Sequence, residues 1–172
     1  MQGIYVLISI RLASAGDLAA ICSLADDINR QHWQHHPQVF LDVAAEGAAD
    51  PDQLSRHSDF WLQAIGEREG TMLVAVAGQT VVGFVMARIL PQPEIPFLAP
   101  RRVCRIGTIV VGTSMQGQGI GQRLMAAAED WARRHDVVEM RLEVFDFNHD
   151  AMRFYDAAGF AVQSHILIRP LD

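Results

Sequence analysis

The hydrophobic residues of this chain fall into short runs with two different spacings, and these predict alternating strands and helices. Runs that are rich in β-branched residues, or that alternate between apolar and polar, predict strands at 4–12, 71–77, 80–90, 103–111, 139–145 and 162–169. Apolar residues three or four positions apart predict helices at 18–28, 51–65, 120–131 and within 148–160. The resulting order is β-α-α-β-β-β-α-β-α-β. It predicts one α/β domain over residues 1–172, with helices flanking a mixed, mostly antiparallel sheet.

Proline and glycine mark where these elements stop. Pro37 ends the first helix and Pro51 opens the second, and the connection between them, from 42 to 51, is small and acidic. Gly78 followed by Gln79 predicts a tight hairpin. Prolines repeated between 91 and 100 predict a loop that joins no sheet ladder.

The most informative stretch is the strand, loop and helix between 103 and 134. Its loop, 116–121, reads Gln-Gly-Gln-Gly-Ile-Gly, with glycine at alternate positions. Glycine lets the backbone turn tightly and approach a ligand, and the loop N–H groups converge at the positive end of the helix dipole. We therefore expect a ligand that carries phosphate. The loop lacks the Gly-Lys-Ser/Thr ending of a nucleotide P-loop, and Gln122 breaks the dinucleotide pattern that starts at Gly117.

The loop does fit the pattern Gln-x-x-Gly-x-Gly, at Gln116, Gly119 and Gly121. This resembles the acetyl-CoA pyrophosphate loop of the GCN5-related N-acetyltransferase (GNAT) family. A second match follows in the expected order and separation: residues 148–160 read NHDAMRFYDAAGF, similar to the family signature of Asn, Ala, Phe-Tyr and Gly-Phe. The resemblance implies the acyl-CoA N-acyltransferase fold, with acetyl-CoA as cosubstrate and no metal.

The resemblance also implies where the cofactor lies. In this family the sheet splits between the strand before the loop and the strand after the next helix, and free backbone groups at the split bind the pantetheine arm. The implied cofactor contacts are Ile109, Val110 and Val111 through their backbone, the loop and helix start at Gln116, Gly117, Gln118, Gly119, Ile120, Gly121 and Gln122, and the side chain of Asn148.

The implied reaction moves an acetyl group from acetyl-CoA to a primary amine of a small molecule or protein, by direct attack in a ternary complex. The attacking amine must lose a proton, the tetrahedral oxyanion needs a donor, and the departing thiolate needs a proton. A backbone N–H near Val111 is the expected donor. Tyr155 matches the family tyrosine that protonates the thiolate.

The group that removes the proton from the amine is not evident. Many family members carry a glutamate on the strand before the loop, whereas residues 103–111 contain no carboxylate. A water relay is our leading interpretation, with Thr108, Glu143, Asp146 and the histidines of 32–36 as alternatives. The same departure leaves a second function open, a non-catalytic acyl-CoA-binding or regulatory module.

Three of the histidines cluster near the end of the first predicted helix. His32 and His36 have a spacing used by zinc sites, but no glutamate follows His32 and no third ligand is close in sequence. We interpret the cluster as either a polar wall of an amine-binding cleft or a solvated helix end. The resemblance assigns the acceptor half of the site to 17–59 and 91–102.

Composition narrows the expected partners. A net charge of −6 argues against nucleic acid and mildly favours a cationic or amine-bearing acceptor. No apolar run approaches the roughly 20 residues of a membrane span, and the first residues lack a signal-peptide pattern, so we expect no membrane partner and a cytoplasmic location. A homodimer follows only from the resemblance. The run 162–169 supplies an edge strand either to a partner or to its own sheet.

Overall fold

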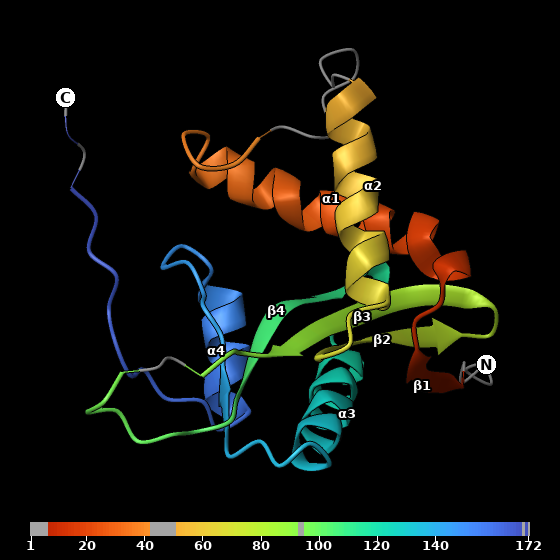
Figure 1. Cartoon of the computed structure of the whole chain (residues 1–172). Helices are drawn as coiled ribbons and strands as arrows, with labels where there is room; N and C mark the ends of the chain where they lie inside the picture. Colours follow the sequence, from red (N-terminus) through yellow and green to blue (C-terminus); the bar gives the residue numbers. More distant parts are fainter. Residues whose placement is uncertain (1–6, 42–50, 93–94, 170, 172) are drawn as a thin grey trace.

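The structure is a computed structural model that describes residues 7–41, 51–92, 95–169 and 171. Its sheet has the order β1-β2-β3-β4-β5, and Figure 1 labels the first four of these strands. The first four strands pair antiparallel and β5 joins β4 in parallel. The strands are β1 (Ile8–Leu12), β2 (Gly70–Ala77), β3 (Thr80–Ile89), β4 (Val103–Val111) and β5 (Glu139–Arg141). The helices are α1 (Leu18–His35), α2 (Pro51–Ile65), α3 (Ile120–Arg133) and α4 (His149–Ala157), with short 3-10 turns at Ala15–Asp17 and Thr113–Met115.

Helices cover both faces of the sheet, with α1 and α2 on one side and α3 on the other (Figure 1). Because side chains alternate along a strand, neighbouring residues of β3 enter two separate cores. Phe84 packs with Ile21 and Trp61 beneath α1 and α2. Val85 packs with Leu124 beneath α3. The sheet is therefore a rigid, doubly covered platform, and β4 and β5 lie at one end of the strand order.

The turn from β1 into α1 is held by a carboxylate that is almost fully buried. Asp17 accepts two hydrogen bonds of 2.8 Å from the Arg11 guanidinium, one from the backbone N–H of Ser14 and one from its hydroxyl. The Arg11 hydrogen bonds, opposed by burial, hold the pKa of Asp17 well below its usual range. This arrangement ties the edge strand to the helix that follows it.

Replacing this carboxylate tests its contribution to stability. We expect Asp17→Ala to lower the free energy of unfolding by about 2 kcal/mol at neutral pH, because four donor atoms lose their acceptor, although two of them belong to the half-exposed Arg11. A carboxylate with a lowered pKa stabilises the fold above its unfolded pKa of about 4, so the gap from wild type should shrink as pH falls below that value. Urea denaturation at several pH values measures the difference in unfolding free energy between the wild type and Asp17→Ala. The control is Asp130→Ala, which removes an exposed ion pair with Arg133. An equal effect of both variants would contradict the assignment.

The mixed α/β fold and most of the predicted elements are confirmed. The hairpin turn lies at Gly78, which has a φ of +63°, and α1 ends before Pro37. Parts of the predicted strand 4–12 and of the connection 42–51 lie outside the described residues. No helix in the described ranges combines the length and hydrophobicity that crossing a membrane requires.

Two predicted strands differ from the structure. The strand expected over 139–145 is assigned only to Glu139–Arg141, because its ladder with β4 ends at the pair Arg105 and Arg141, just before β4 bulges. The final strand expected at 162–169 is absent from the described chain, and this run is exposed coil. An alternating apolar pattern is not enough to form a strand, because the backbone groups of a strand must pair with those of a neighbouring strand. The edge strand β5 has only three residues with which a further strand could pair.

Candidate active site

The loop between β4 and α3 owes its shape to glycines at two positions with left-handed backbone. Gly117 has a φ of +74°, and Gly119, the N-cap of α3, has a φ of +75°. A side chain is strained in this region, so glycine is required there. The first bond into the helix runs from the Arg123 N–H to the Gly119 carbonyl. The N–H groups of residues 120–122 therefore have no intrahelical acceptor and are available to an anion at the helix start.

Two further contacts fix this loop in place. The Gln116 side-chain amide donates to the Val111 carbonyl at 3.0 Å, which ties the start of the loop to the end of β4. Gly121 has a different role from the other glycines, since a Cβ there would lie 3.3 Å from the Phe154 ring. Its missing side chain lets α4 pack on the first turn of α3. The loop is thus held between β4 and α4.

The sheet opens beside this loop. The parallel ladder of β4 with β5 covers only 103–105, so 106–111 has no strand partner on that edge. Gly112 donates to the Val82 carbonyl, and antiparallel pairing directs the backbone groups of alternate residues to opposite edges. Val110 therefore faces β3, while Ile109 and Val111 direct their N–H groups toward the open edge. The predicted split between β4 and β5 is present in the structure.

Helix α4 brings the predicted acid and the predicted asparagine to one element. Asn148 caps the helix, because its side-chain oxygen accepts from the Ala151 N–H at 3.1 Å. This uses the oxygen and leaves the amide N–H₂ for another partner. Tyr155 is largely buried between Phe154 and Phe160, with ring centroids 5.3 and 5.8 Å away. Burial raises the pKa of its phenol above the ordinary value of about 10, so Tyr155 stays protonated at neutral pH.

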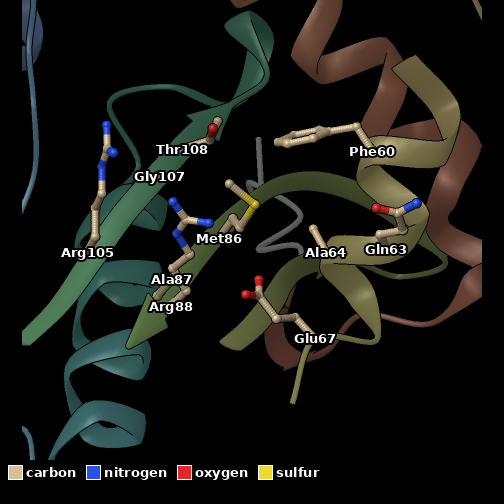
Figure 2. A pocket seen from close by; sticks show the side chains of 10 residues that line it. All are labelled: Phe60, Gln63, Ala64, Glu67, Met86, Ala87, Arg88, Arg105, Gly107 and Thr108. Carbon is tan, nitrogen blue, oxygen red and sulfur yellow. The ribbon is translucent and has the colours of Figure 1, made fainter. Parts of the chain in front are cut away.

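A cleft of about 550 Å³ lies on the other side of β4, between that strand, β3 and α2 (Figure 2). At one end Thr108 faces Phe60, Glu67 and Arg88 lie toward the other end, and Arg105 extends along the β4 side of the cleft. The remaining lining residues are Gln63, Ala64, Met86, Ala87 and Gly107. One end of the cleft therefore presents an aromatic ring and a hydroxyl group, and the other end presents charged side chains.

A β-bulge shapes the floor of this cleft. Met86 pairs with Thr108, and the next residue, Ala87, pairs with Ile106, so Gly107 is the extra residue on β4. A Cβ at Gly107 would lie 2.5 Å from the terminal methyl of Met86. Glycine at the bulge lets Met86 lie flat on the strand and turns Thr108 toward the cleft.

The other candidates for the base lie elsewhere. Glu143 approaches Arg105 at 3.4 Å in an exposed ion pair. His32 stacks on Phe40 at 4.8 Å, and His35 stacks on Phe147 at 4.1 Å, in an aromatic cluster that joins the end of α1 to the loop before α4. Burial and the neighbouring imidazoles lower the pKa of His32. No group of three potential ligands able to hold a metal occurs within the part of the chain that the structure describes.

With this geometry in view, the chain can be compared with known proteins. The model of the acetyltransferase (GNAT) family matches residues 25–160. This chain belongs to the GNAT family. The family expected from the two sequence signatures is thereby confirmed.

The individual relatives of this GNAT chain described below share 18% to 28% sequence identity with it. A mycothiol acetyltransferase of Acidimicrobium ferrooxidans is 28% identical over 140 residues, which make up 79% of this chain and 39% of that relative. The solved tetramutant of the BH1408 protein from Bacillus halodurans is 23% identical, with a TM-score of 0.82 over 95% of this chain and 99% of that chain. The aminoglycoside N-acetyltransferase AAC(6')-Iy in complex with CoA is 18% identical, with a TM-score of 0.69 over 99% of each chain. At these identities the solved structures show the shared fold.

The GNAT cleft contains residues that our sequence analysis did not select. Its lining comes from 60–67, 86–88 and 105–108, outside the two ranges that we expected to form the acceptor half. Two features of the sequence could have indicated these residues. Phe60 and Ala64 lie at helical spacing near the end of α2, with Glu67 two residues beyond it, and Gly107 interrupts a β-branched strand, which is typical of a bulge.

Proposed function

We propose that this GNAT chain transfers an acetyl group from acetyl-CoA to a primary amine by direct attack in a ternary complex. One observation carries the proposal: the end of β4 separates the glycine loop 116–121 and an open strand edge from a cleft. Thr108 lines the cleft, and the next residue, Ile109, directs its N–H to the open edge. A thioester bound along that edge and an amine bound in the cleft would therefore lie next to each other at the end of β4.

The cofactor half follows from the backbone. The pyrophosphate would bind the free N–H groups at the start of α3, the pantetheine arm would bind the open edge of β4 at Ile109, and the Val111 N–H would face the carbonyl of the thioester. Val110, which we expected to contact the cofactor through its backbone, is left out of this half, because its backbone faces β3 and its side chain is buried in the core beneath α1 and α2. The amide N–H₂ of Asn148 is placed to donate, since its oxygen is committed to the helix cap. The solved complex of AAC(6')-Iy with CoA supports a CoA-binding role for this fold.

The chemistry would proceed in two steps at one carbonyl carbon. The deprotonated amine forms a C–N bond and the carbonyl becomes an oxyanion, which the Val111 N–H stabilises. The C–S bond then breaks, and the thiolate takes the phenolic proton of Tyr155, while the nitrogen loses its extra proton to water and the tyrosinate regains a proton from solvent. The raised pKa of Tyr155 suits this role, because a proton must be present to be donated.

Water remains our preferred route for the proton of the attacking ammonium. Thr108 is the hydroxyl at the apolar end of the cleft and can orient a water molecule there. Glu67 is the carboxylate in the cleft lining, but it lies at the opposite end from Thr108 (Figure 2). Glu143 is about half-exposed and is not among the residues that line the cleft. These placements favour a water relay over a dedicated carboxylate.

A non-catalytic acyl-CoA-binding module is the second candidate function. The observation in its favour is that β4 carries no carboxylate over its whole length, Val103–Val111. Such a module would keep the loop and the open edge, and would bind acetyl-CoA without consuming it.

Thermal shift followed by a thiol-release assay distinguishes these functions. Acetyl-CoA and CoA at a hundredfold excess over Kd should raise the melting temperature by roughly 5–10 °C, whereas ATP and NAD should not. An amine panel with acetyl-CoA should then release free thiol for particular amines. Stabilisation without release for any amine would favour the binding module, and absence of stabilisation by either CoA species would contradict both candidates.

A further inference from the structure

The cleft lining includes two arginines on neighbouring strands. Arg88 of β3 and Arg105 of β4 are register partners, so their side chains leave the sheet on the same face, and both line the cleft (Figure 2). Like charges directly opposite each other across an antiparallel pair destabilise a sheet. A pair of this kind is understandable where both guanidinium groups serve an anionic ligand.

The carboxylates nearby do not neutralise this pair. Arg105 meets Glu143 at 3.4 Å, but both side chains are about half-exposed, and such a surface pair is weak and easily displaced. Glu67 leans against Gly70, the register partner of Arg88 on β2. Within the described ranges, Arg88 forms no ion pair with Glu67 or with another carboxylate. The Arg88 guanidinium is therefore available to a ligand.

The position of this pair sets the shape of the ligand. In the proposed reaction the attacking amine lies at the Thr108 end of the cleft, next to the open edge of β4. Arg105 lies three residues earlier on the same strand, which corresponds to roughly 10 Å. A ligand that spans the cleft would place its amine at Thr108 and its anionic end against the Arg88 guanidinium, with Arg105 able to approach the same end from the neighbouring strand.

We propose that the acceptor is an amine that also carries an anionic group, a carboxylate or a phosphate, several bonds from the amine, and that Arg88 with Arg105 binds this group. The proposal rests on the proposed acetyl transfer, whose acceptor side it specifies. Polycationic amines such as aminoglycosides are disfavoured, because they would bring positive charge to the arginine pair.

Matched amines test this specificity. The panel contains an ω-amino acid, the same molecule with its carboxylate amidated, an ω-aminoalkyl phosphate of equal length, and a linear polyamine. We expect kcat/KM for the carboxylate or the phosphate to exceed that for the amide by about tenfold or more, since charge-assisted hydrogen bonds contribute about 1.5–3 kcal/mol. The ratio of the two anionic amines decides between carboxylate and phosphate. A higher kcat/KM for the polyamine would overturn the proposal.

Arginine variants locate the effect. Arg88→Gln should bring the ratio of kcat/KM for the anionic amine to that for the amide down toward one, and should leave the Kd of acetyl-CoA unchanged. Arg133→Gln on α3 makes the same change in net charge, outside the cleft, and should keep the preference. Retention of the preference in Arg88→Gln would overturn the assignment.

A binding readout separates this proposal from the proposed transferase. The anionic amine should raise the melting temperature of the wild-type protein more than its amide does, with CoA present, and Arg88→Gln should abolish that difference. This difference in stabilisation would support the arginine site even if no amine released thiol. Absence of thiol release would count against acetyl transfer only. Equal stabilisation by the anionic amine and its amide would count against the arginine site.

Discussion

Tyr155→Phe should reduce kcat for acetyl transfer by about a hundredfold and leave the Kd of acetyl-CoA nearly unchanged. The substitution removes one hydroxyl, while the ring keeps its contacts with Phe154 and Phe160. The loss in kcat therefore reports the proton that the phenol would give to the departing thiolate.

The pH profile sharpens this prediction. Because burial raises the pKa of Tyr155, the wild-type phenol loses its proton only above the ordinary tyrosine value of about 10. Wild-type kcat should fall on the alkaline side of that value, and this limb should be missing in Tyr155→Phe. Steady-state kinetics across pH, limited to the range where the melting temperature is constant, measures both effects.

A matched control separates chemistry from packing near Tyr155. Phe160→Leu disturbs the ring against which Tyr155 packs but keeps the hydroxyl. It should lower the melting temperature and retain the alkaline limb. If Tyr155→Phe retained both full turnover and that limb, Tyr155 would have no part in proton transfer.

Gly119→Val should weaken acetyl-CoA binding by about tenfold to a hundredfold. Gly119 caps α3 with a φ of +75°, and a β-branched residue is strained there, so the loop backbone must shift. The shift would misdirect the N–H groups at the helix start, and hydrogen bonds to a charged group contribute about 1.5–3 kcal/mol. Isothermal titration with acetyl-CoA measures the loss.

Gly78→Val provides the matched control for this loop variant. Gly78 has a φ of +63° in the turn between β2 and β3, and a Cβ there has open space around it. Both variants should lower the melting temperature through backbone strain, but only Gly119→Val should change acetyl-CoA affinity. Equal affinities in the two variants would contradict the assignment of the loop as the pyrophosphate site.

The cofactor half of the site could be predicted from local sequence. Loop 116–121 takes its shape from glycines with left-handed backbone and from the helix that follows, and both effects act within a few residues. Asn148 and Tyr155 likewise belong to one short helix. Such local constraints are visible in a sequence because neighbouring residues satisfy them.

The cleft that we propose for the acceptor could not be predicted in the same way. Glu67, Arg88 and Arg105 come from the turn after α2 and from two strands, and they line one cleft only because β3 pairs with β4 in one register and α2 covers that face. A register shifted by one residue would send these arginines to opposite faces. The bulge at Gly107, which turns Thr108 into the cleft, also depends on the pairing with Met86.

The shortened β5 and the exposed run 162–169 show the same limit. Their apolar patterns are compatible with strands, but a strand exists only where a neighbour pairs with its backbone. The sequence by itself determined the order of most elements, the glycine loop and the family, since spacing and backbone preference act locally. The tertiary structure decided the extent of the split beside β4, the cleft and its arginine pair, because strand register brings distant residues together.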